Sequence, residues 1–345
     1  MPRNTPVKRK IISASVNISL ADRLDALGKA VHTAKSRLLD EAIIDLLAKY
    51  KYNGKDIIIM SQQDATTPVE TKHVLCIANN KGGVGKTTTT AALAYLFAKR
   101  GRRRVLLIDA DAQINLTLIM QAPLNDKQNI KNAILSDIAQ SGLSVDHFIT
   151  PTQYEAIDMI PGSEIISNDA FMGKIKNARV EYGINPWKDI VEDVKKLQRY
   201  DIILIDTHPS NNAETTLPMQ AADCVLVPTQ PSNNSVAGLY QIYDCIRKSR
   251  RTAPNLRYLG MFFNCVKQHT SSAKELIPAA REGVPQKIAE MNGGAADGIV
   301  FQTVIRDSED VRKAENFQAA VTDKFRNKNV SKDFEALYEE VLSVL

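Results

Sequence analysis

The fold of this chain is decided by the stretch Asn80-Lys81-Gly82-Gly83-Val84-Gly85-Lys86-Thr87-Thr88. The short apolar segment before it, residues 74–78, is typical of a buried strand. Residues 87–98, which follow it, have the composition of a helix. A strand, a glycine loop and a helix in this order predict a phosphate-binding loop.

The residue types of this loop suit phosphate chemistry. Glycines let consecutive backbone N–H groups face phosphate oxygens, and the start of the helix adds partial positive charge. Lys86 is expected to reach the β- and γ-phosphates of ATP, and the Thr87 hydroxyl to ligate Mg²⁺. The residues expected to bind the nucleotide are Gly82, Gly83, Val84, Gly85, Lys86, Thr87 and Thr88. The alternative is a glycine turn with a surface lysine.

Composition limits the classes of protein that remain. A chain of 345 residues can hold two domains, and 44% hydrophobic residues suffice for a core. No stretch approaches the roughly 18 apolar residues of a membrane span. The four cysteines are scattered without a C-x-x-C pair. This argues against a disulfide framework or a zinc ribbon and predicts a cytoplasmic protein.

The positive charge of the chain is concentrated at its start. The net charge is +5, and residues 1–52 account for all of it, with ten basic and five acidic side chains. A localised basic segment predicts a polyanionic partner such as DNA.

The first 52 residues show the pattern of one strand and two short helices. Apolar and polar residues alternate over residues 12–18, and helical spacing follows over residues 20–31 and 33–50. So small a unit buries its apolar faces only when two copies pair. The segment resembles the ribbon-helix-helix family of DNA-binding domains. We therefore expect a β-α-α module over residues 1–52, a linker over 53–71 and a second domain over 72–345.

The resemblance implies DNA contacts for this module. Ser13, Ser15 and Asn17 would face base edges in the major groove. The residues implied to contact the DNA backbone are Arg9, Lys10, Thr33 and Lys35. The alternative is a dimerisation module whose polar ribbon face is solvated.

From residue 72 onward, apolar strand patterns alternate with helical ones. The predicted strands are residues 74–78, 104–108, 157–160, 201–205, 224–227 and 258–263. Continuous apolar strands separated by helices predict an α/β fold with a doubly wound, mostly parallel sheet. Ligands of such sheets bind at the carboxyl ends of the strands.

This second domain resembles the ParA/MinD family of P-loop ATPases, and among them the DNA partition proteins. The resemblance rests on the Lys81 to Thr88 loop and on the segment from Asp109 to Thr117. It is reinforced by Ile160-Pro161-Gly162, by Asp201 to Ser210, and by Pro228-Thr229-Gln230-Pro231 with Ala237-Gly238-Leu239. Ala112 and His208 depart from the family pattern, which has proline at both places. We expect His208 to be a solvated loop residue; the alternative is a histidine that tunes hydrolysis.

The resemblance implies a role for each matching residue. Lys81 would reach the γ-phosphate held by a partner subunit, so that two subunits enclose two ATP molecules. Asp111 would position the attacking water. Asp206 and Asp109 would hold Mg²⁺ with Thr87, and Asn264 would hydrogen-bond adenine. The residues implied to bind DNA non-specifically are Arg247, Arg306 and Arg312.

Related families are disfavoured by their missing residues. Nitrogenase-type reductases need cysteines for a cluster, and none occurs between Cys76 and Cys224. MinD-like ATPases end in a basic amphipathic helix, whereas residues 332–345 are acidic and predict packing on the domain instead of a membrane.

The sequence thus predicts a nucleoid-associated partition ATPase. Its expected partners are DNA, a ParB-like centromere-binding adaptor and a second copy of itself. The alternative is a transcriptional repressor that ATP switches with little or no hydrolysis.

Overall fold

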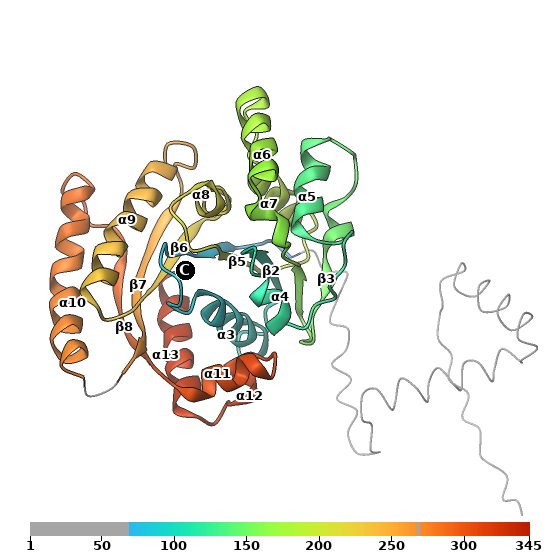
Figure 1. The fold of residues 1–345 in the computed structure, drawn as a ribbon. Coiled ribbons are helices and arrows are strands. Elements are labelled where there is room, and N and C mark those ends of the chain that lie inside the picture. Colours follow the sequence, from blue (N-terminus) through green and yellow to red (C-terminus); the bar gives the residue numbers. More distant parts are fainter. Residues whose placement is uncertain (1–68, 268–269) are drawn as a thin grey trace, which may run out of the picture. The chain divides into compact units, whose positions relative to one another are not determined.

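The computed structural model of the protein describes residues 69–267 and 270–345 (Figure 1). Its centre is an eight-stranded sheet in the order β3-β4-β2-β5-β1-β6-β7-β8. The strands are β1 (His73–Ile77), β2 (Val105–Ala110), β3 (Thr150–Pro151), β4 (Ile157–Ile160), β5 (Ile202–Thr207), β6 (Cys224–Thr229), β7 (Arg257–Val266) and β8 (Ile299–Arg306). All neighbouring strands are parallel except β3 and β4, which confirms the predicted mostly parallel sheet.

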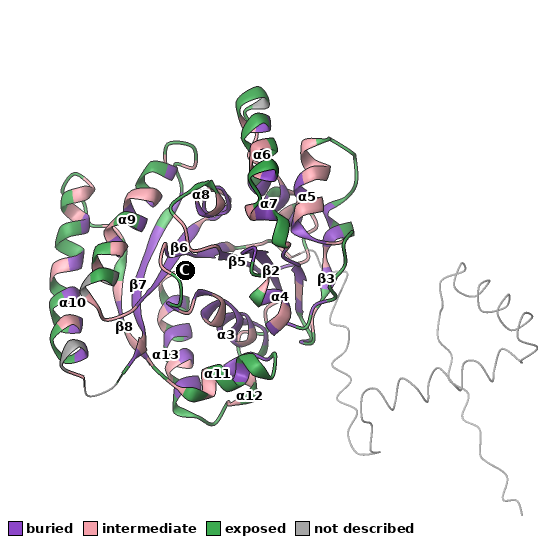
Figure 2. Ribbon diagram, in the orientation of Figure 1, coloured by how far each residue is buried: buried purple, intermediate pink, exposed green. Residues whose placement is uncertain are grey.

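Helices cover the sheet on both faces, so the central strands β1, β2, β5 and β6 are almost entirely buried (Figure 2). Alternate residues of β1 enter different cores: Val74 and Cys76 pack on one face, Leu75 and Ile77 on the other. The first core is completed by α5 (Ile130–Ile138), α6 (Asp169–Tyr182), α7 (Pro186–Lys196), α8 (Ala213–Gln220), α9 (Asn233–Ser249) and α10 (Ser271–Met291). The second is completed by α3 (Lys86–Lys99), α4 (Asn115–Ile119), α11 (Glu309–Asn316), α12 (Val321–Lys324) and α13 (Asn329–Val344). Two short 3₁₀ turns are η1 (Val145–Phe148) and η2 (Glu164–Ser167).

The strands predicted from apolar runs are all present, but two strands were missed. β3 has only two residues, and β8 is an edge strand in which only Phe301 and Ile305 are buried. Arg306, one of the residues implied to bind DNA, is the last residue of this strand. The acidic C-terminal segment forms α13, whose buried Phe334 and Leu337 pack on the domain, as expected.

The start of the described chain is already joined to the sheet. The Val69 N–H donates to the carbonyl of Gln198 at 2.6 Å, and the Lys72 N–H donates to that of Asp201 at 3.0 Å. The predicted ribbon-helix-helix module, with its DNA-contacting residues, and most of the predicted linker lie outside the described residues.

Candidate functional site

The glycine loop joins β1 to α3 at the carboxyl edge of the sheet. Gly85 caps α3 in the left-handed region, with φ of 82°, which a side chain would strain. A Cβ atom on Gly85 would also lie 2.2 Å from Asn264 Nδ2. Glycine is required here because the loop backbone turns tightly against the end of β7.

Two side chains from neighbouring strand ends fix the shape of this loop. Asn264 Nδ2 donates to the carbonyl of Val84 at 2.8 Å, and Gln230 Nε2 donates to that of Gly83 at 2.9 Å. Asn264 is 3% exposed, and its Oδ1 accepts from the Cys265 N–H. The structure gives Asn264 a role in holding the loop, and its contact with adenine stays a prediction.

Lys86 lies inside the loop and is almost completely buried. Its Nζ donates to the carbonyl of Lys81 at 3.3 Å. Burial lowers the pKa of Lys86, while the nearby Asp206 and Asp111 carboxylates favour its charged form. The buried ammonium group is thus held at the loop by negative charge on the adjacent strand ends.

Asp109 and Asp206 lie side by side near the carboxyl ends of the neighbouring strands β2 and β5. They are register partners of β2 and β5, and both are fully buried. Thr87 Oγ1 donates to Asp206 Oδ2 at 2.7 Å, and Asp109 Oδ2 accepts from the N–H and hydroxyl of Thr117 at 2.9 and 2.7 Å. A Cβ atom on Gly162 would lie 2.9 Å from Asp109 Oδ2, so the Ile160-Pro161-Gly162 motif makes room for this carboxylate.

Burial makes the negative charge of this pair unfavourable. It raises the pKa of Asp109 to about 6, although the hydrogen bonds from Thr117 oppose the change. Burial also raises the pKa of Asp206, and the Asp109 carboxylate adds to that effect. A cation beside these carboxylates would relieve the cost of burying them.

The residues predicted to bind metal, Thr87, Asp109 and Asp206, suit a hard cation that keeps water or phosphate oxygens among its ligands. Thr87 and Asp206 meet directly, whereas Asp109 is engaged by Thr117. Within residues 69–267 and 270–345, no three His, Cys, Asp or Glu side chains form a cluster that could hold a metal by themselves. Mg²⁺ accepts such a site, because it usually binds one or two carboxylates together with water and phosphate oxygens.

Asp111 lies at the same edge and is bound by a histidine. His208 Nδ1 lies 2.9 Å from Asp111 Oδ1, which also accepts the Gln113 N–H at 3.0 Å. On the other side of the ring, His208 Nε2 lies 3.8 Å from Glu214 Oε2. The expectation that His208 is a solvated loop residue was wrong, because the side chain is only 24% exposed and contacts Asp111.

These groups surround two adjoining cavities. The first has a volume of about 440 Å³, and Lys86, Thr87 and Asp111 line it. The second, of about 240 Å³, extends past Asn264 towards α11. Glu315 of α11 lines both and accepts a hydrogen bond from the Thr88 hydroxyl at 2.8 Å. One end of these cavities offers a lysine, glycine N–H groups and hydroxyls, which suit phosphates, and a cleft continues beyond it. Together they fit a nucleoside triphosphate.

Sequence reasoning missed several residues of this site. Thr90, Thr117, Glu214 and Glu315 reach it from helices that begin at different places in the chain. Only Thr90 had a local signal, because it is one turn beyond the loop on the same helix. The others depend on tertiary packing.

The predicted DNA-binding arginines of this domain differ in their surroundings. Arg247 is half exposed and pairs with Asp244 at 2.8 Å on the last turns of α9. Arg312 is 64% exposed and lies 3.4 Å from Asp307. Arg306 binds both oxygens of Asp333 at 2.6 and 2.8 Å, so its guanidinium is engaged within the domain. DNA contact by these three residues stays a prediction.

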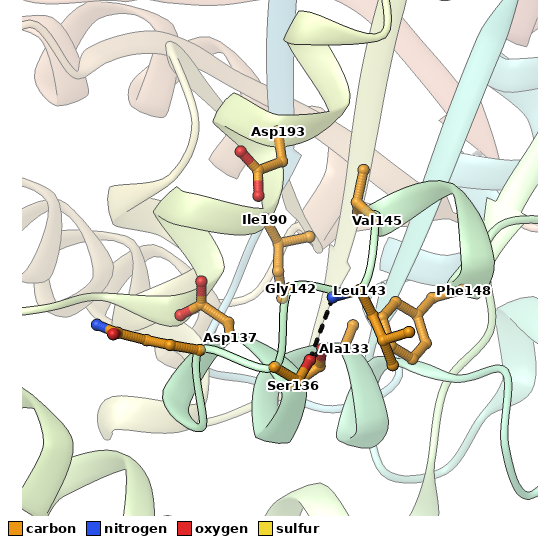
Figure 3. A pocket seen from close by; sticks show the side chains of 11 residues that line it. Ala133, Ser136, Asp137, Gly142, Leu143, Val145, Phe148, Ile190 and Asp193 are labelled. Atoms are coloured by element: carbon orange, nitrogen blue, oxygen red, sulfur yellow. Dashed lines mark hydrogen bonds between the residues drawn. The ribbon is translucent and has the colours of Figure 1, made fainter.

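A third cavity, of about 280 Å³, is lined by residues of α5, η1 and α7 (Figure 3). Its buried apolar residues belong to the first core, on the face of the sheet opposite α3. Ala133, Ile190 and Phe148 give it an apolar floor, and Asp137 of α5 and Asp193 of α7 stand at its rim. Asp137 Oδ2 is buried without a hydrogen-bond partner. None of the residues predicted from the sequence lines this cavity, and we assign no ligand to it.

Two family models match this chain. Residues 72–258 match the family model of the AAA domain, and residues 8–51 match that of the ribbon-helix-helix domain. The chromosome partitioning protein ParA of Caulobacter vibrioides is 32% identical over 217 residues, which cover 62% of this chain and 78% of the relative.

Solved structures share the fold at low identity. Apo McdA of Cyanothece superposes with a TM-score of 0.62 at 20% identity, covering 78% of this chain and 99% of that one. The cell division ATPase MinD of Pyrococcus furiosus has a TM-score of 0.57 at 21% identity and covers 79% of this chain and 99% of its own. Among the described residues, no helix has the length and apolar character needed to cross a membrane.

Proposed function

This chain belongs to the ParA family of P-loop ATPases, and on that premise we propose that it is a DNA partition ATPase. Two subunits would enclose two ATP molecules, bind DNA in that state and hydrolyse ATP slowly. A centromere-binding adaptor of the ParB type would stimulate hydrolysis and release the DNA. The protein would act in the cytoplasm on nucleoid DNA.

One observation carries this proposal. Lys86, Thr87 and the carboxylate of Asp111 line the same cavity at the carboxyl edge of the sheet. The loop supplies positive charge and N–H donors for phosphates. Asp111 adds an acceptor that can orient a water for attack on the γ-phosphate. A site that only bound nucleotide would not need this carboxylate.

The buried acids support a divalent cation at the site. Mg²⁺ would be held by the Thr87 hydroxyl and by Asp206 through water, and Asp109 would add negative charge behind them. When bound, Mg²⁺ neutralises charge that develops on the phosphates during transfer. The hydrogen bond from the Thr87 hydroxyl to Asp206 Oδ2, 2.7 Å long, supports this proposal because it brings the two side chains together.

Lys81 is proposed to act across the dimer interface. It precedes two exposed glycines of the loop, Gly82 and Gly83, so this part of the loop is accessible to a second subunit. A cation donated to the partner's γ-phosphate would stabilise the transferring phosphoryl group. We expect the Lys81→Ala protein to bind ATP but to lose turnover and the ATP-dependent contact between the two ATPase domains.

DNA binding is proposed for two parts of the chain. The last turns of α9 carry Arg247 and Lys248, which share Asp244 and leave an excess of positive charge there. The ribbon-helix-helix domain of residues 8–51 would bind a specific operator or centromere site and regulate expression. The domain division would follow residues 1–52, 53–71 and 72–345.

Steady-state ATP turnover of the full chain tests the proposal. We expect slow, Mg²⁺-dependent hydrolysis that rises when DNA and the cognate adaptor are added together. Because residues 1–52 are expected to pair without nucleotide, chemical cross-linking between the ATPase domains, and not the oligomeric state, should rise with ATP and fall with ADP. Rapid hydrolysis by a monomer, with no response to Lys81→Ala, would contradict the proposal.

A repressor switched by ATP is the second candidate, and the ribbon-helix-helix match favours it. Such a protein would bind operator DNA differently with ATP and ADP while its turnover stayed undetectable. Measuring operator affinity and turnover on the same preparation separates the two functions. Turnover that the adaptor stimulates supports partition.

A further inference from the structure

The register of two strands brings His208 beside Asp111. β2 and β5 pair Asp109 with Asp206 and Ala110 with Thr207. Asp111 and His208 each follow the last residue of their strand, so the pairing continues one step past the sheet. There His208 Nδ1 and Asp111 Oδ1 are 2.9 Å apart. A carboxylate only accepts hydrogen bonds, so Nδ1 is the nitrogen that donates.

The histidine is itself held from the other side. The hydroxyl of Thr215, which is fully buried, donates to the carbonyl of His208 at 2.6 Å and fixes its backbone. Glu214 of α8 places Oε2 at 3.8 Å from His208 Nε2. The ring therefore lies between two carboxylates, and only 24% of it is exposed.

This arrangement restricts how Asp111 can turn. Its Oδ1 accepts both the ring N–H of His208 and the backbone N–H of Gln113. With that oxygen held by two donors, rotation of the carboxylate is limited, and Oδ2 is the oxygen that these donors leave for other contacts. Asp111 lines the cavity that also contains Lys86 and Thr87.

We propose that His208 is a positioning residue for Asp111, with Glu214 supporting the ring. The inference rests on the proposed function, in which Asp111 orients the attacking water. Small displacements of a positioned group reduce a rate strongly without changing the binding of the substrate. His208 should therefore affect turnover far more than nucleotide affinity.

Two substitutions of His208 separate positioning from other roles. Leucine fills much of the volume but cannot donate to Asp111. Asparagine carries an amide nitrogen close to the place of Nδ1 and can still donate. We expect H208L to lower kcat about 10- to 100-fold with KM for ATP changed less than about threefold, and H208N to stay within about threefold of the parent. The matched control is H147L, because His147 is exposed and does not line the cavity.

Combined variants and a second position add an independent readout. If His208 acts through Asp111, the double variant D111N/H208L should be no slower than D111N alone. Substitutions at residues that act together have non-additive effects on the rate. E214Q, which removes the charge behind the ring, should lower kcat by a smaller factor. Should H208L fail to fold, H208N and E214Q still test the inference.

The outcomes distinguish this inference from the proposed function. If D111N hydrolyses ATP like the parent, the proposed function fails. If D111N is inactive while H208L matches the parent, or if H208N is as slow as H208L in a folded protein, only the positioning role is overturned. Equal losses of ATP affinity and kcat in H208L would likewise overturn it.

Discussion

Replacing Asp137 with asparagine is expected to stabilise the protein at neutral pH. Asp137 lies in the last turn of α5, where the helix dipole disfavours negative charge. Its Oδ2 is buried without a hydrogen-bond partner. Asp193, which lines the same cavity (Figure 3), and Asp189 both repel its negative charge. Burial, followed by these two carboxylates, raises the pKa of Asp137 from 3.8 to about 6.

The sign of the effect follows from that direction. The folded state binds the proton of Asp137 more tightly than the unfolded state, so ionisation costs stability. The cost is complete above about pH 6 and disappears below about pH 4. The displaced pKa corresponds to about 3 kcal/mol, which we reduce to about 1 kcal/mol because part of the side chain faces water.

Thermal unfolding of the two proteins measures this difference. For D137N we expect a melting temperature about 2–4 °C above the parent at pH 7.5 and no gain near pH 4. D126N is the control, because Asp126 is exposed and its substitution should change nothing at either pH. An equal gain at both pH values, or a loss at pH 7.5, would refute the electrostatic argument.

Three further predictions concern the nucleotide site. G85A should weaken ATP binding at least about tenfold, because Gly85 has φ of 82° and a Cβ atom there would displace Asn264. The control is G173A, which should leave ATP binding unchanged because a Cβ atom at Gly173 meets nothing within 4 Å. Titration calorimetry measures both affinities. D206N should raise the melting temperature of the nucleotide-free protein at pH 8, because burial disfavours the charge of Asp206. Mg²⁺ with ATP should no longer raise the melting temperature of this variant, and a rise like that of the parent would contradict the prediction. E315Q should tighten ATP binding a few-fold at low salt, because Glu315 brings negative charge to the phosphate-binding cavity, and an unchanged or weaker Kd would count against it.

Local sequence predicted the parts of the site that are close together in the chain. The loop from Lys81 to Thr88 needs only its glycines, its lysine and the flanking strand and helix to be identified. The acids Asp109 and Asp206 follow apolar runs that are typical of buried strands, so the sequence pattern alone predicts that they lie at the carboxyl edge of the sheet. Strand order was not needed for either conclusion.

The contacts that could not be predicted depend on packing between distant segments. The hydrogen bond of His208 to Asp111 requires the register of β2 against β5, which no local pattern specifies. The pair of Arg306 and Asp333 joins β8 to α13 across 27 residues, so a basic side chain that looked available for DNA is held within the domain. Charge counted along a sequence overestimates the charge a surface presents.

Carboxylates are buried at a cost to stability in two places, at the glycine loop and around Asp137, and the groups that surround them differ. At the glycine loop, Lys86 and Thr87 at the start of α3 line the cavity, and the Thr87 hydroxyl contacts the buried Asp206 directly, so a cation and phosphate bound there can compensate each other's charge. Around Asp137, the carboxylates meet an apolar floor, and the two hydroxyls that line the cavity, those of Ser136 and Ser141, are hydrogen-bonded to each other. A buried charge indicates a ligand site only where groups of the opposite kind converge on the same space, and that condition is met at the loop.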